Sequence, residues 1–385
     1  MSASSSSPAG SGLRVGIVGG GQLARMMAEA APHLGIAVTV LDPTPGAPAS
    51  DIASQIVGGF DDRAALRELA RDSDVVTLDI EAVSAAALAV LEESGVRVAP
   101  SSRVLGIIQD KLVQKRFLDT HGLPSGRFAA VDDAESLRAF GLPCILKARR
   151  HGYDGRGVKR VASVEDAAEL LAGGPCLAEE IVDIEKELAI MVARSARGEI
   201  ALYPVVEAEF DAAANILNTI TAPAEVTGEI AAQCAGLATR CVTALDGTGI
   251  FGIEFFLDRS GRVLVNEISP RPHNSGHYTI EACATSQFEQ HLRAVTNMPL
   301  GPTTLLRAAA SFNLLGEPDA FGRPIYAGLE EAQRAGDIGV HLYGKLSVKP
   351  WRKMGHVTVT ADSSGNAAGK AERLKSVMKV RGTGK

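Results

Sequence analysis

Two glutamates in the second half of the chain have the type and spacing of metal ligands. Glu254 lies in one apolar run and Glu267 in the next, and residues 259–262 between the runs are turn formers. A four-residue turn would pair Asp258 with Val263, and this register places the two glutamates opposite each other, about 5 Å apart. Two like charges there are destabilising unless a cation joins them, and Mg²⁺ prefers carboxylate oxygens as ligands.

The competing interpretation of this pair is a solvated sheet face that carries two unrelated acids. The neighbouring Phe255, Phe256 and Val265 are too apolar for a solvated face. The pattern therefore favours a magnesium ion that is bound together with the phosphates of a nucleotide.

A lysine and a glycine-rich segment upstream suit the same nucleotide. Lys147 ends the apolar strand 144–146, where its ammonium could reach a phosphate. Arg149 and Arg150 follow, and residues 152–157 then hold three glycines, which free the backbone to present N–H groups to phosphate oxygens. No Gly-Lys-Ser/Thr follows, so this is not a Walker A motif. A plain hairpin tip is the alternative, and the adjacent cations favour a phosphate lid.

A third polar segment directly follows the second glutamate. Residues 269–278 contain two prolines that fix the backbone, and the segment offers hydrogen-bond donors from Arg271, His273, Asn274 and His277. Such a rigid polar loop suits an oxyanion, with Arg271 as a fork for a carbonate or carboxylate group. Any one of its histidines could equally be structural.

The N-terminal region contains a glycine motif with a different meaning. Gly19, Gly21 and Ala24 follow a strand and open a helix, and Asp42 ends the next strand about twenty residues on. This spacing is typical of the dinucleotide-binding fingerprint and would suit an NAD- or FAD-dependent oxidoreductase. The motif is weak, because it requires only a tight turn and close packing. A second interpretation is that the helix N-terminus receives a substrate phosphate.

The elements that must position these residues indicate an α/β protein. Strands alternate with helices in roughly the first 100 residues, which predicts a parallel sheet of βαβ units. One helix is expected over 102–121, ended by Gly122. Beyond it, antiparallel hairpins surround a long helix at 230–245, and the C-terminal part gives short strands such as 339–346 and 356–359.

Composition excludes several functional classes. The chain has 385 residues, 46% of them hydrophobic and 22% charged, which is typical of a soluble protein with more than one domain. The net charge of -6 argues against a nucleic-acid partner, and no stretch approaches the roughly 20 apolar residues that cross a membrane. The five cysteines show no C-x-x-C spacing, so we expect reduced thiols without disulfides or zinc.

Together the motifs resemble the ATP-grasp superfamily and, within it, the N5-carboxyaminoimidazole ribonucleotide synthetase family of purine biosynthesis. The resemblance covers roughly residues 14–360 and is greatest to eukaryotic forms, which are commonly fused to a carboxylase domain. It rests on six groups of residues: Gly19–Leu23, Gln109–Lys111 with Gln114 and Lys115, Tyr153–Gly157, Asn266–Ile268, Arg271 with His273–His277, and Arg352–His356.

The resemblance implies a parallel α/β pre-ATP-grasp domain, a central α+β ATP-grasp domain and a small β-rich C-terminal domain. We expect a disordered leader over 1–12, the first domain over 13–110, the second over 111–310, the third over 311–362, and a C-terminal helix or tail over 363–385. The implied ligands are ATP with Mg²⁺, or Mn²⁺ in its place, together with 5-aminoimidazole ribonucleotide and bicarbonate. A cytoplasmic or plastid homodimer is implied, as is a fused or separate carboxylase or mutase partner.

The same resemblance assigns a role to each matching residue. ATP binding falls to Lys111, Lys147, the lid Gly152, Tyr153, Asp154, Gly155, Arg156, Gly157 and Val158, the hinge Glu179, Glu180, Ile181 and Val182, and Glu187, Asn266 and Glu267. Mg²⁺ binding falls to Glu254 and Glu267, and the catalytic residues that hold bicarbonate and carboxyphosphate are Arg271, His273 and Asn274. The ribonucleotide site comprises Gly21, Gln22, Tyr153, Arg156, Ser275, Lys345, Arg352 and Lys353.

The implied reaction has two stages. Bicarbonate attacks the γ-phosphorus of ATP and forms carboxyphosphate, and the amine of the ribonucleotide then captures the carboxyl group or the CO₂ released from it. Four positions depart from the family pattern, namely Ala24, Asp79, Phe210 and Trp351. Trp351 stands where glycine is usual, and its bulk could disturb contacts with the substrate phosphate.

Three other functions are compatible with part of these residues. Another ATP-grasp carboxylate–amine ligase, a transformylase or a biotin carboxylase relative would share the nucleotide site, and the run His273–His277 argues against it. An NAD-dependent oxidoreductase would use the N-terminal glycines and would change absorbance with NAD(P)H. A nucleotide-binding module without catalysis would show no substrate-stimulated release of phosphate.

Overall fold

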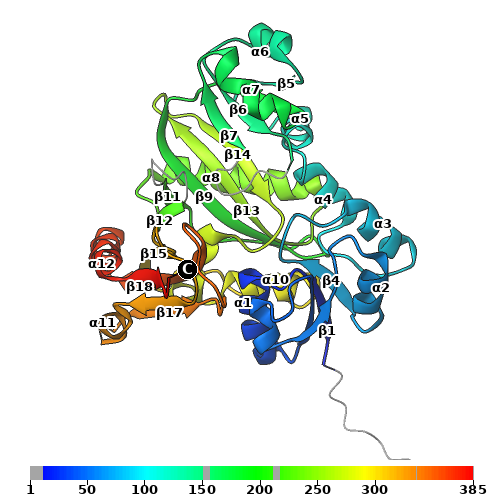
Figure 1. Cartoon of the computed structure of the whole chain (residues 1–385), viewed down its shortest axis with the longest axis vertical. Coiled ribbons are helices and arrows are strands. Elements are labelled where there is room, and N and C mark those ends of the chain that lie inside the picture. Colours follow the sequence, from blue (N-terminus) through cyan, green and yellow to red (C-terminus); the bar gives the residue numbers. More distant parts are fainter. Residues whose placement is uncertain (1–11, 151–156, 211–216, 335, 385) are drawn as a thin grey trace, which may run out of the picture.

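The N-terminal lobe is a parallel sheet between helices, as the alternation of strands and helices predicts. The computed structural model describes residues 12–150, 157–210, 217–334 and 336–384, and Figure 1 shows this lobe in blue. The strand order is β3-β2-β1-β4, with β1 (Arg14–Val18), β2 (Ala37–Asp42), β3 (Ser54–Val57) and β4 (Val75–Leu78). The helices are α1 (Gln22–Ala30), α2 (Arg63–Arg71) and α3 (Ala85–Glu93), with 3₁₀ turns at Ala31–Leu34 and Pro48–Asp51. Because side chains alternate along β1, Ile17 packs with α1 and Val18 packs with α2 and α3.

A small antiparallel sheet forms the upper lobe of Figure 1. Its order is β5-β8-β6-β7, with β5 (Phe128–Val131), β6 (Cys144–Ala148), β7 (Val158–Val161) and β8 (Cys176–Glu179). Helices α6 (Ala134–Phe140) and α7 (Val164–Ala172) pack on its buried side chains, and each begins with a capping box, at Asp133 and Ser163. The glycine-rich segment belongs to the connection between β6 and β7.

A sheet of nine strands runs through the described part of the middle and C-terminal regions. Its order is β14-β13-β9-β11-β12-β15-β18-β17, and β10 pairs with β9. The strands are β9 (Ile184–Arg194), β10 (Ile200–Leu202), β11 (Val206–Phe210), β12 (Leu217–Ala222), β13 (Gly249–Asp258), β14 (Val263–Ser269), β15 (Ala308–Leu315), β17 (Ile338–Leu342) and β18 (Lys353–Ala361). Helix α8 (Gly228–Leu245) packs on β9, β13 and β14 through Leu237, Cys241 and Leu245, and this is the largest core cluster.

The C-terminal region continues this sheet rather than starting another. Strand β12 pairs with β15 from Thr219↔Phe312 to Ala222↔Ala309, and β15 runs across the expected domain boundary between residues 310 and 311. The remaining elements are α9 (Thr279–Ala282), α10 (Gln287–Val295), α11 (Leu329–Arg334), α12 (Ser364–Val377) and the two-stranded ladder of β16 (Pro324–Ala327) and β19 (Lys379–Gly382). Helix α12 covers β15 and β18 with Ala367, Ala371 and Leu374.

The helix expected over 102–121 is wrong as one unit, because it is broken in the middle. It forms α4 (Ser102–Ile108) and α5 (Lys111–Thr120), and Asp110 between them has extended backbone. The Asp110 carboxylate accepts from the N–H groups of Leu112 and Val113, at 3.0 and 3.3 Å, and so caps α5. The break places Lys111 in the first turn of α5, from which its side chain reaches β14. Among the described helices, none is both long and apolar enough to span a bilayer.

Candidate active site

Glu254 and Glu267 are paired across the β13–β14 hairpin, as the sequence predicts, but through a different register. Leu257 pairs with Val263, so the predicted pairing of Asp258 with Val263 is wrong by one residue. A β-bulge on β14 adds one residue, Asn266, and brings Glu267 back opposite Glu254. The bulge also turns Asn266 toward the same place, since its Nδ2 donates to Glu254 Oε2 at 3.3 Å.

The two glutamates have opposite electrostatic surroundings. Burial, the Glu267 charge and Glu187 together raise the pKa of Glu254 to about 7. Burial alone would raise the pKa of Glu267 as well, but the Lys111 ammonium overcomes it and lowers this pKa to about 2. Glu187 on β9 lies on the same face, and burial raises its pKa to about 7. Glu267 is therefore held ionised by an ammonium group, whereas burial disfavours the ionised forms of Glu254 and Glu187.

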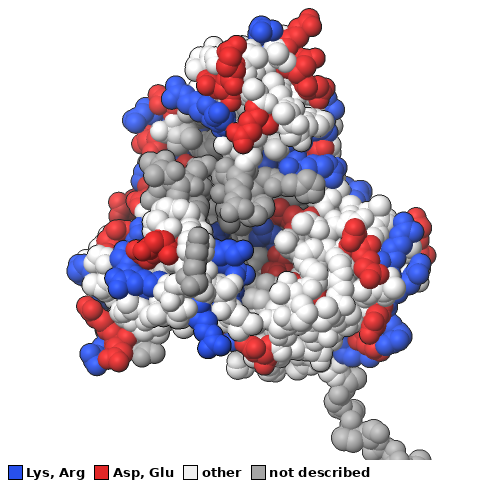
Figure 2. All heavy atoms as spheres, in the orientation of Figure 1, with Lys and Arg blue, Asp and Glu red and all other residues white. Residues whose placement is uncertain are grey.

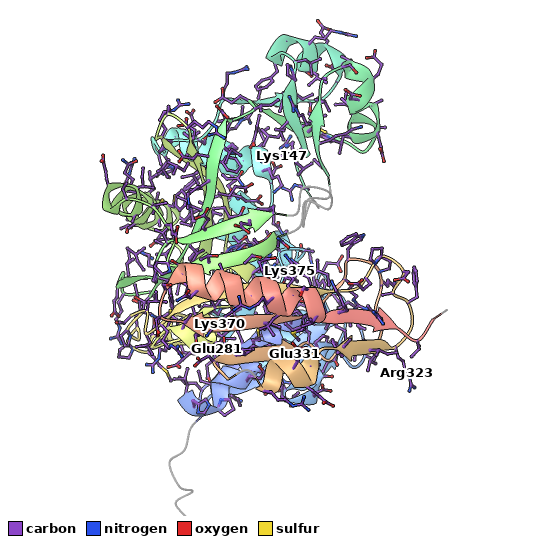
Figure 3. All side chains as sticks on the ribbon, turned by 90° about the vertical axis from the view of Figure 1, so that its left-hand side faces the viewer. Lys147, Glu281, Arg323, Glu331, Lys370 and Lys375 are labelled. Atoms are coloured by element: carbon purple, nitrogen blue, oxygen red, sulfur yellow. The ribbon has the colours of Figure 1, made fainter. Side chains whose placement is uncertain are left out.

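Three lysines are paired with carboxylates of the hairpin and of the hinge. Lys111 Nζ lies 2.5 Å from Glu267 Oε1, and Lys147 Nζ lies 2.6 Å from Glu179 Oε2. Lys115 Nζ lies 3.2 Å from the other oxygen of Glu179 and points to the backbone of β14. Figure 3 labels Lys147 at the base of the upper lobe, and Figure 2 shows a hollow between the lobes where acidic and basic side chains gather.

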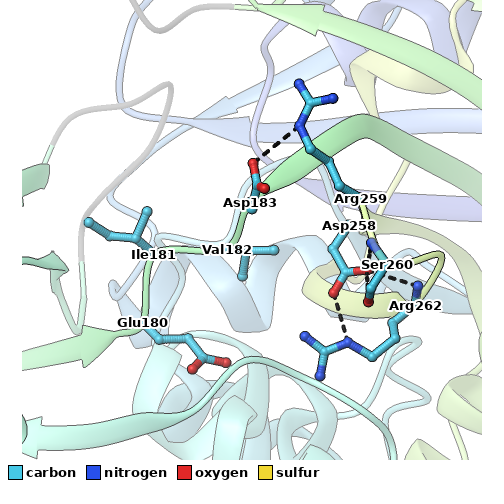
Figure 4. Close-up of a pocket in the computed structure, with 8 residues that line it drawn as sticks. All are labelled: Glu180, Ile181, Val182, Asp183, Asp258, Arg259, Ser260 and Arg262. Atoms are coloured by element: carbon cyan, nitrogen blue, oxygen red, sulfur yellow. Dashed lines mark hydrogen bonds and ion pairs between the residues drawn. The ribbon is translucent and has the colours of Figure 1, made fainter.

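The predicted hinge, residues 179–182, connects the small sheet to the large one. The carboxylate of Glu179 is paired with Lys115 and Lys147. A nucleotide base would therefore meet the backbone of Glu179 rather than its side chain. A cavity of about 250 Å³ lies between residues 180–183 and the hairpin turn 258–262 (Figure 4). Arg259 joins the two walls, with its Nε 3.3 Å from Asp183 Oδ1. This contact ties the glutamate hairpin to the hinge.

The polar segment after β14 turns back toward the glutamates, and we call residues 270–277 the anion loop. Arg271 Nε lies 3.2 Å from Glu81 Oε1, and His273 Nε2 lies 3.7 Å from Glu254 Oε1. His273 Nδ1 is hydrogen-bonded to Ser275 Oγ at 2.8 Å, and Gly252 below it leaves the space that a Cβ would fill. The loop thus places an imidazole next to Glu254 and a guanidinium next to Glu81.

The predicted ribonucleotide lysines approach the N-terminal lobe from the β17–β18 connection. Lys345 Nζ donates to Gln22 Oε1 at 2.9 Å and to the Lys353 carbonyl at 2.6 Å. Arg352 is exposed and donates to Ser347, whereas Lys353 is buried at the start of β18. The structure therefore brings Gln22, Lys345 and Lys353 together.

The N-terminal glycine motif is closed by two aspartates. Gly21 and Ala24 donate their N–H groups to Asp79, at 2.7 and 3.1 Å, and Gly20 donates to Asp42 at 2.9 Å. A dinucleotide would need these N–H groups for its pyrophosphate and this Asp42 for its ribose. The protein's own carboxylates occupy them, so the oxidoreductase interpretation is wrong. The N–H of Gly21, one of the predicted substrate ligands, is also used by Asp79.

The predicted lid is described only at its edge. Its residues Gly152, Tyr153, Asp154, Gly155 and Arg156 lie outside the described part of the chain. Gly157 has a φ of 72°, and its carbonyl accepts from the Ala148 N–H at 2.7 Å, while Val158 pairs with Lys147. The cations expected to hold phosphate here have a protein partner, because Arg149 and Arg150 lie 2.6 and 3.4 Å from Asp110.

Four residues that complete the site were not predicted as part of it. Lys115 pairs with the hinge residue Glu179, and Glu81 pairs with Arg271. Asp79 accepts from the first glycine loop, and Asp110 caps α5. Lys115 had a signal in the sequence, because it follows Lys111 by four residues and so shares its helix face. The others depend on contacts between distant parts of the chain.

Three family models match successive parts of the chain. They are described as the ribonucleotide synthetase preATP-grasp domain (residues 13–109), the ATP-grasp domain (116–288) and the phosphoribosylaminoimidazole carboxylase C-terminal domain (309–370). The chain is 41% identical to the N5-carboxyaminoimidazole ribonucleotide synthase of Synechococcus elongatus, over 94% of this chain and 93% of that protein.

Two solved structures extend this likeness. The crystal structure of N5-carboxyaminoimidazole ribonucleotide synthetase from Thermotoga maritima has a TM-score of 0.88 and 47% identity, and the match covers 96% of this chain and 99% of that one. The Aspergillus clavatus enzyme in complex with ADP and 5-aminoimidazole ribonucleotide has a TM-score of 0.86 and 35% identity, with 95% and 98% covered. Both cover all three matched regions.

Proposed function

Since the chain belongs to the N5-carboxyaminoimidazole ribonucleotide synthase family, we propose that the hollow between its lobes holds ATP, bicarbonate and 5-aminoimidazole ribonucleotide together. The protein is an ATP-grasp ligase of purine biosynthesis, and it uses ATP and bicarbonate to carboxylate the amino group of that ribonucleotide. A bicarbonate oxygen attacks the γ-phosphorus, ADP leaves and carboxyphosphate forms. The amine nitrogen then attacks the carboxyl carbon, phosphate leaves and the amine loses a proton.

The lysines of the hollow are proposed to bind the phosphates of ATP. Lys111 begins α5 and Lys147 lies on β6, and their ammonium groups lie 2.5 and 2.6 Å from Glu267 and Glu179. Phosphoryl transfer depends on positioning and on neutralising charge on the transferred group. Two ammonium groups fixed by buried carboxylates are proposed to supply both, while the backbone of residues 180–182 is left to meet the adenine.

Glu254 and Glu267 are proposed to hold Mg²⁺ together with phosphate oxygens. The fit rests on the raised pKa of Glu254, whose cause is burial beside a second carboxylate, because a cation relieves both. The described residues contain no cluster of three or more histidine, cysteine, aspartate or glutamate ligands, so ATP would complete the coordination. When bound, the ion would neutralise charge that develops on the phosphates. Asn266 lies beside both glutamates and would orient them.

The anion loop is proposed to bind bicarbonate and then carboxyphosphate. Arg271 offers a planar fork for a carboxyl group, and His273, two residues on, lies 3.7 Å from Glu254. Asn274 belongs to the same turn. Fixed donors of this kind stabilise an oxyanion without reorganising during the reaction.

The ribonucleotide is proposed to bind between the β17–β18 connection and the first glycine loop. Lys345 and Lys353 supply positive charge, and Lys345 already reaches Gln22 of the N-terminal lobe. We also propose that Arg352 and Ser275 contact the ribonucleotide. The contacts proposed for Tyr153 and Arg156 involve residues outside the described part of the chain.

One observation carries these assignments, namely that a single hairpin and its following loop present two paired acids and then Arg271 and His273. Phosphate release measured with bicarbonate, with and without 5-aminoimidazole ribonucleotide, tests the proposal. We expect the ribonucleotide to stimulate release, and the product to appear in equal amount. Release that ignores both bicarbonate and the ribonucleotide would contradict it.

The assembly and location predicted from the resemblance stay proposals. We propose a homodimer in the cytoplasm whose product passes to a fused or separate carboxylase or mutase. Sedimentation of the purified chain tests the dimer, and a single species with the mass of one 40.1 kDa chain would contradict it.

A further inference from the structure

Four aromatic rings are stacked in a column behind the anion loop. The ring column consists of Phe288, His277, His356 and His341, in that order. The centroids of successive rings lie 5.8, 4.4 and 4.5 Å apart, with interplanar angles of 27°, 25° and 15°. His277 and His356 at its centre are each 1% exposed. Stacked histidines in a protein interior call for an explanation, because each imidazole is a polar group that burial penalises.

The ring column joins two parts of the proposed active site. His277 directly follows the 3₁₀ turn Asn274–Gly276 of the anion loop. His341 and His356 face each other in the ladder of β17 and β18, and β18 begins with Lys353, three residues before His356. The column therefore spans from the proposed carboxyl-binding loop to the strand that carries a proposed ribonucleotide lysine.

The protonation of His277 follows from its neighbours. The His273 N–H donates to Gln287 Oε1 at 2.9 Å, and Gln287 Nε2 donates to the His273 carbonyl at 2.8 Å, which fixes the orientation of the Gln287 amide. The same Nε2 lies 3.1 Å from His277 Nδ1, so Nδ1 must accept and the proton of the neutral ring must lie on Nε2. This Nε2 has no hydrogen-bond partner among the described residues.

The histidines at the other end of the column also have hydrogen-bond partners. His341 Nε2 lies 2.6 Å from Glu281 Oε1, and Figure 3 labels this glutamate in the C-terminal half of the molecule. Tyr343 Oη is hydrogen-bonded to His356 Nδ1 at 3.0 Å, and Tyr343 precedes Lys345 by two residues. Both ribonucleotide lysines thus lie within three residues of a side chain in, or bonded to, the column.

Neither a general base at His277 nor a metal site fits the ring column. A general base needs a free lone pair, and His277 uses its Nδ1 to accept from Gln287 while its Nε2 holds the proton. A metal site is not supported either, because the described residues contain no group of three or more suitable ligands. Burial holds the pKa of His277 and of His356 well below the usual value, so neutral rings can stack without repulsion.

We propose that the ring column is a positioning device, which sets the distance between the anion loop and the two ribonucleotide lysines, one in the β17–β18 connection and one at the start of β18. This inference rests on the proposed function and deepens it. Flat rings in contact resist tilting and sliding, so the loop and the strand keep one separation. The consequence is that the amine of the bound ribonucleotide meets the carboxyl group at one distance, as a reaction between two bound substrates requires.

The test replaces the central ring with and without preserving its shape. His356→Ala removes the ring, and His356→Phe keeps a flat ring but removes the hydrogen bond to Tyr343 Oη. His291→Ala is the control for general destabilisation, since His291 is equally buried; it shares α10 with Phe288, but its hydrogen bonds run to Thr77 of β4 and Ile250 of β13 rather than to the column. The chain has a single tryptophan, Trp351, which lies two residues before Lys353. Its backbone N–H donates to the Gly316 carbonyl. Its fluorescence and anisotropy report on this segment without any turnover.

For His356→Ala we expect about a tenfold rise in the KM and Kd for the ribonucleotide, the size of one lost coupling, with the KM for ATP within about twofold. His356→Phe should recover most of this loss. The anisotropy of Trp351 should fall in His356→Ala and recover in His356→Phe, whether or not substrate binds.

The inference is overturned if His356→Phe is as impaired as His356→Ala, or if His356→Ala weakens ATP and ribonucleotide equally, as general destabilisation in His291→Ala would. An unchanged Trp351 anisotropy in His356→Ala would also overturn it. A wild-type protein without ribonucleotide-stimulated phosphate release would instead refute the proposed function, while the anisotropy comparison would still decide the role of the column.

Discussion

Glu254 and Glu267 face each other only because Asn266 bulges out of the ladder between them. Without the extra residue, the register near the turn would place Asn266 opposite Glu254 and turn Glu267 to the other side of the sheet. The bulge therefore creates the acidic pair and adds an amide beside it, at 3.3 Å from Glu254. A local irregularity of the backbone here positions the groups proposed to hold the metal.

Glu267→Ala should abolish turnover of Mg·ATP. The variant loses one proposed metal ligand and leaves Lys111 without its carboxylate, so we expect phosphate release to fall at least about a hundredfold. Glu330→Ala is the control, because Glu330 is exposed and forms a surface ion pair with Arg334. Near-normal release by the first variant would count against the metal assignment.

Lys147→Met should weaken ATP binding and leave ribonucleotide binding unchanged. The ammonium lies on the lobe that carries the hinge, and its loss should raise the KM for ATP about tenfold or more. Lys159→Met, an exposed lysine on the neighbouring strand, serves as control. An equal rise for both substrates would show that Lys147 acts on the fold of the site as a whole.

Lys353→Ala should chiefly raise the KM for the ribonucleotide. Lys353 begins β18, and its carbonyl also holds Lys345, so the backbone contact survives the substitution. Lys349→Ala on the same connection removes an exposed lysine and should leave the KM unchanged. Initial rates at varied ribonucleotide and varied ATP separate the two constants, and an effect on ATP alone would reassign Lys353 to the nucleotide.

The stability of the fold should fall as the pH drops below about 6.5. Burial lowers the pKa of His291 to about 3, and this residue links Thr77 of β4 to the Ile250 N–H of β13. Its folded pKa lies below the unfolded value, so its contribution is complete above pH 6.5 and is lost as the pH falls toward 3. At pH 5 the loss should reach about 2 kcal/mol.

Urea unfolding at pH 7.5 and pH 5 measures this loss. His291→Gln should be less stable at pH 7.5 and should show a smaller difference between the two pH values. His33→Gln, an exposed histidine, should behave as the wild type does. A pH dependence unchanged in His291→Gln would show that other groups carry it.

The residues that follow local rules were predictable from the sequence. The strand that Lys147 ends and the long helix expected at 230–245 agree with β6 and α8 within two residues, because apolar runs and a capping residue define them. The Glu254–Glu267 pair was also predicted, although the ladder that leads to it was not. A bulge depends on how Asn266 packs against β13 and leaves no mark in the hydrophobic pattern.

The residues that depend on long-range contacts could not be predicted. The glycine fingerprint has the right spacing for a dinucleotide, and only the approach of Asp79 across the sheet shows that its N–H groups are taken. Likewise, His277, His341 and His356 are spread over eighty residues of sequence and become neighbours only in the fold. A function assigned to the groups of one segment is therefore reliable only if no residue from a distant segment binds those groups.

The pairing of β12 with β15 decides where the molecule can bend. Four residue pairs, from Thr219↔Phe312 to Ala222↔Ala309, join the two regions, and a swing of the C-terminal region would have to break their hydrogen bonds. Among the described residues the upper lobe shares no ladder with the large sheet, so we expect it to move more readily than the C-terminal region. Truncating the chain before residue 308 would remove β15 and leave β12 as an exposed edge strand, which could pair with another copy of the chain.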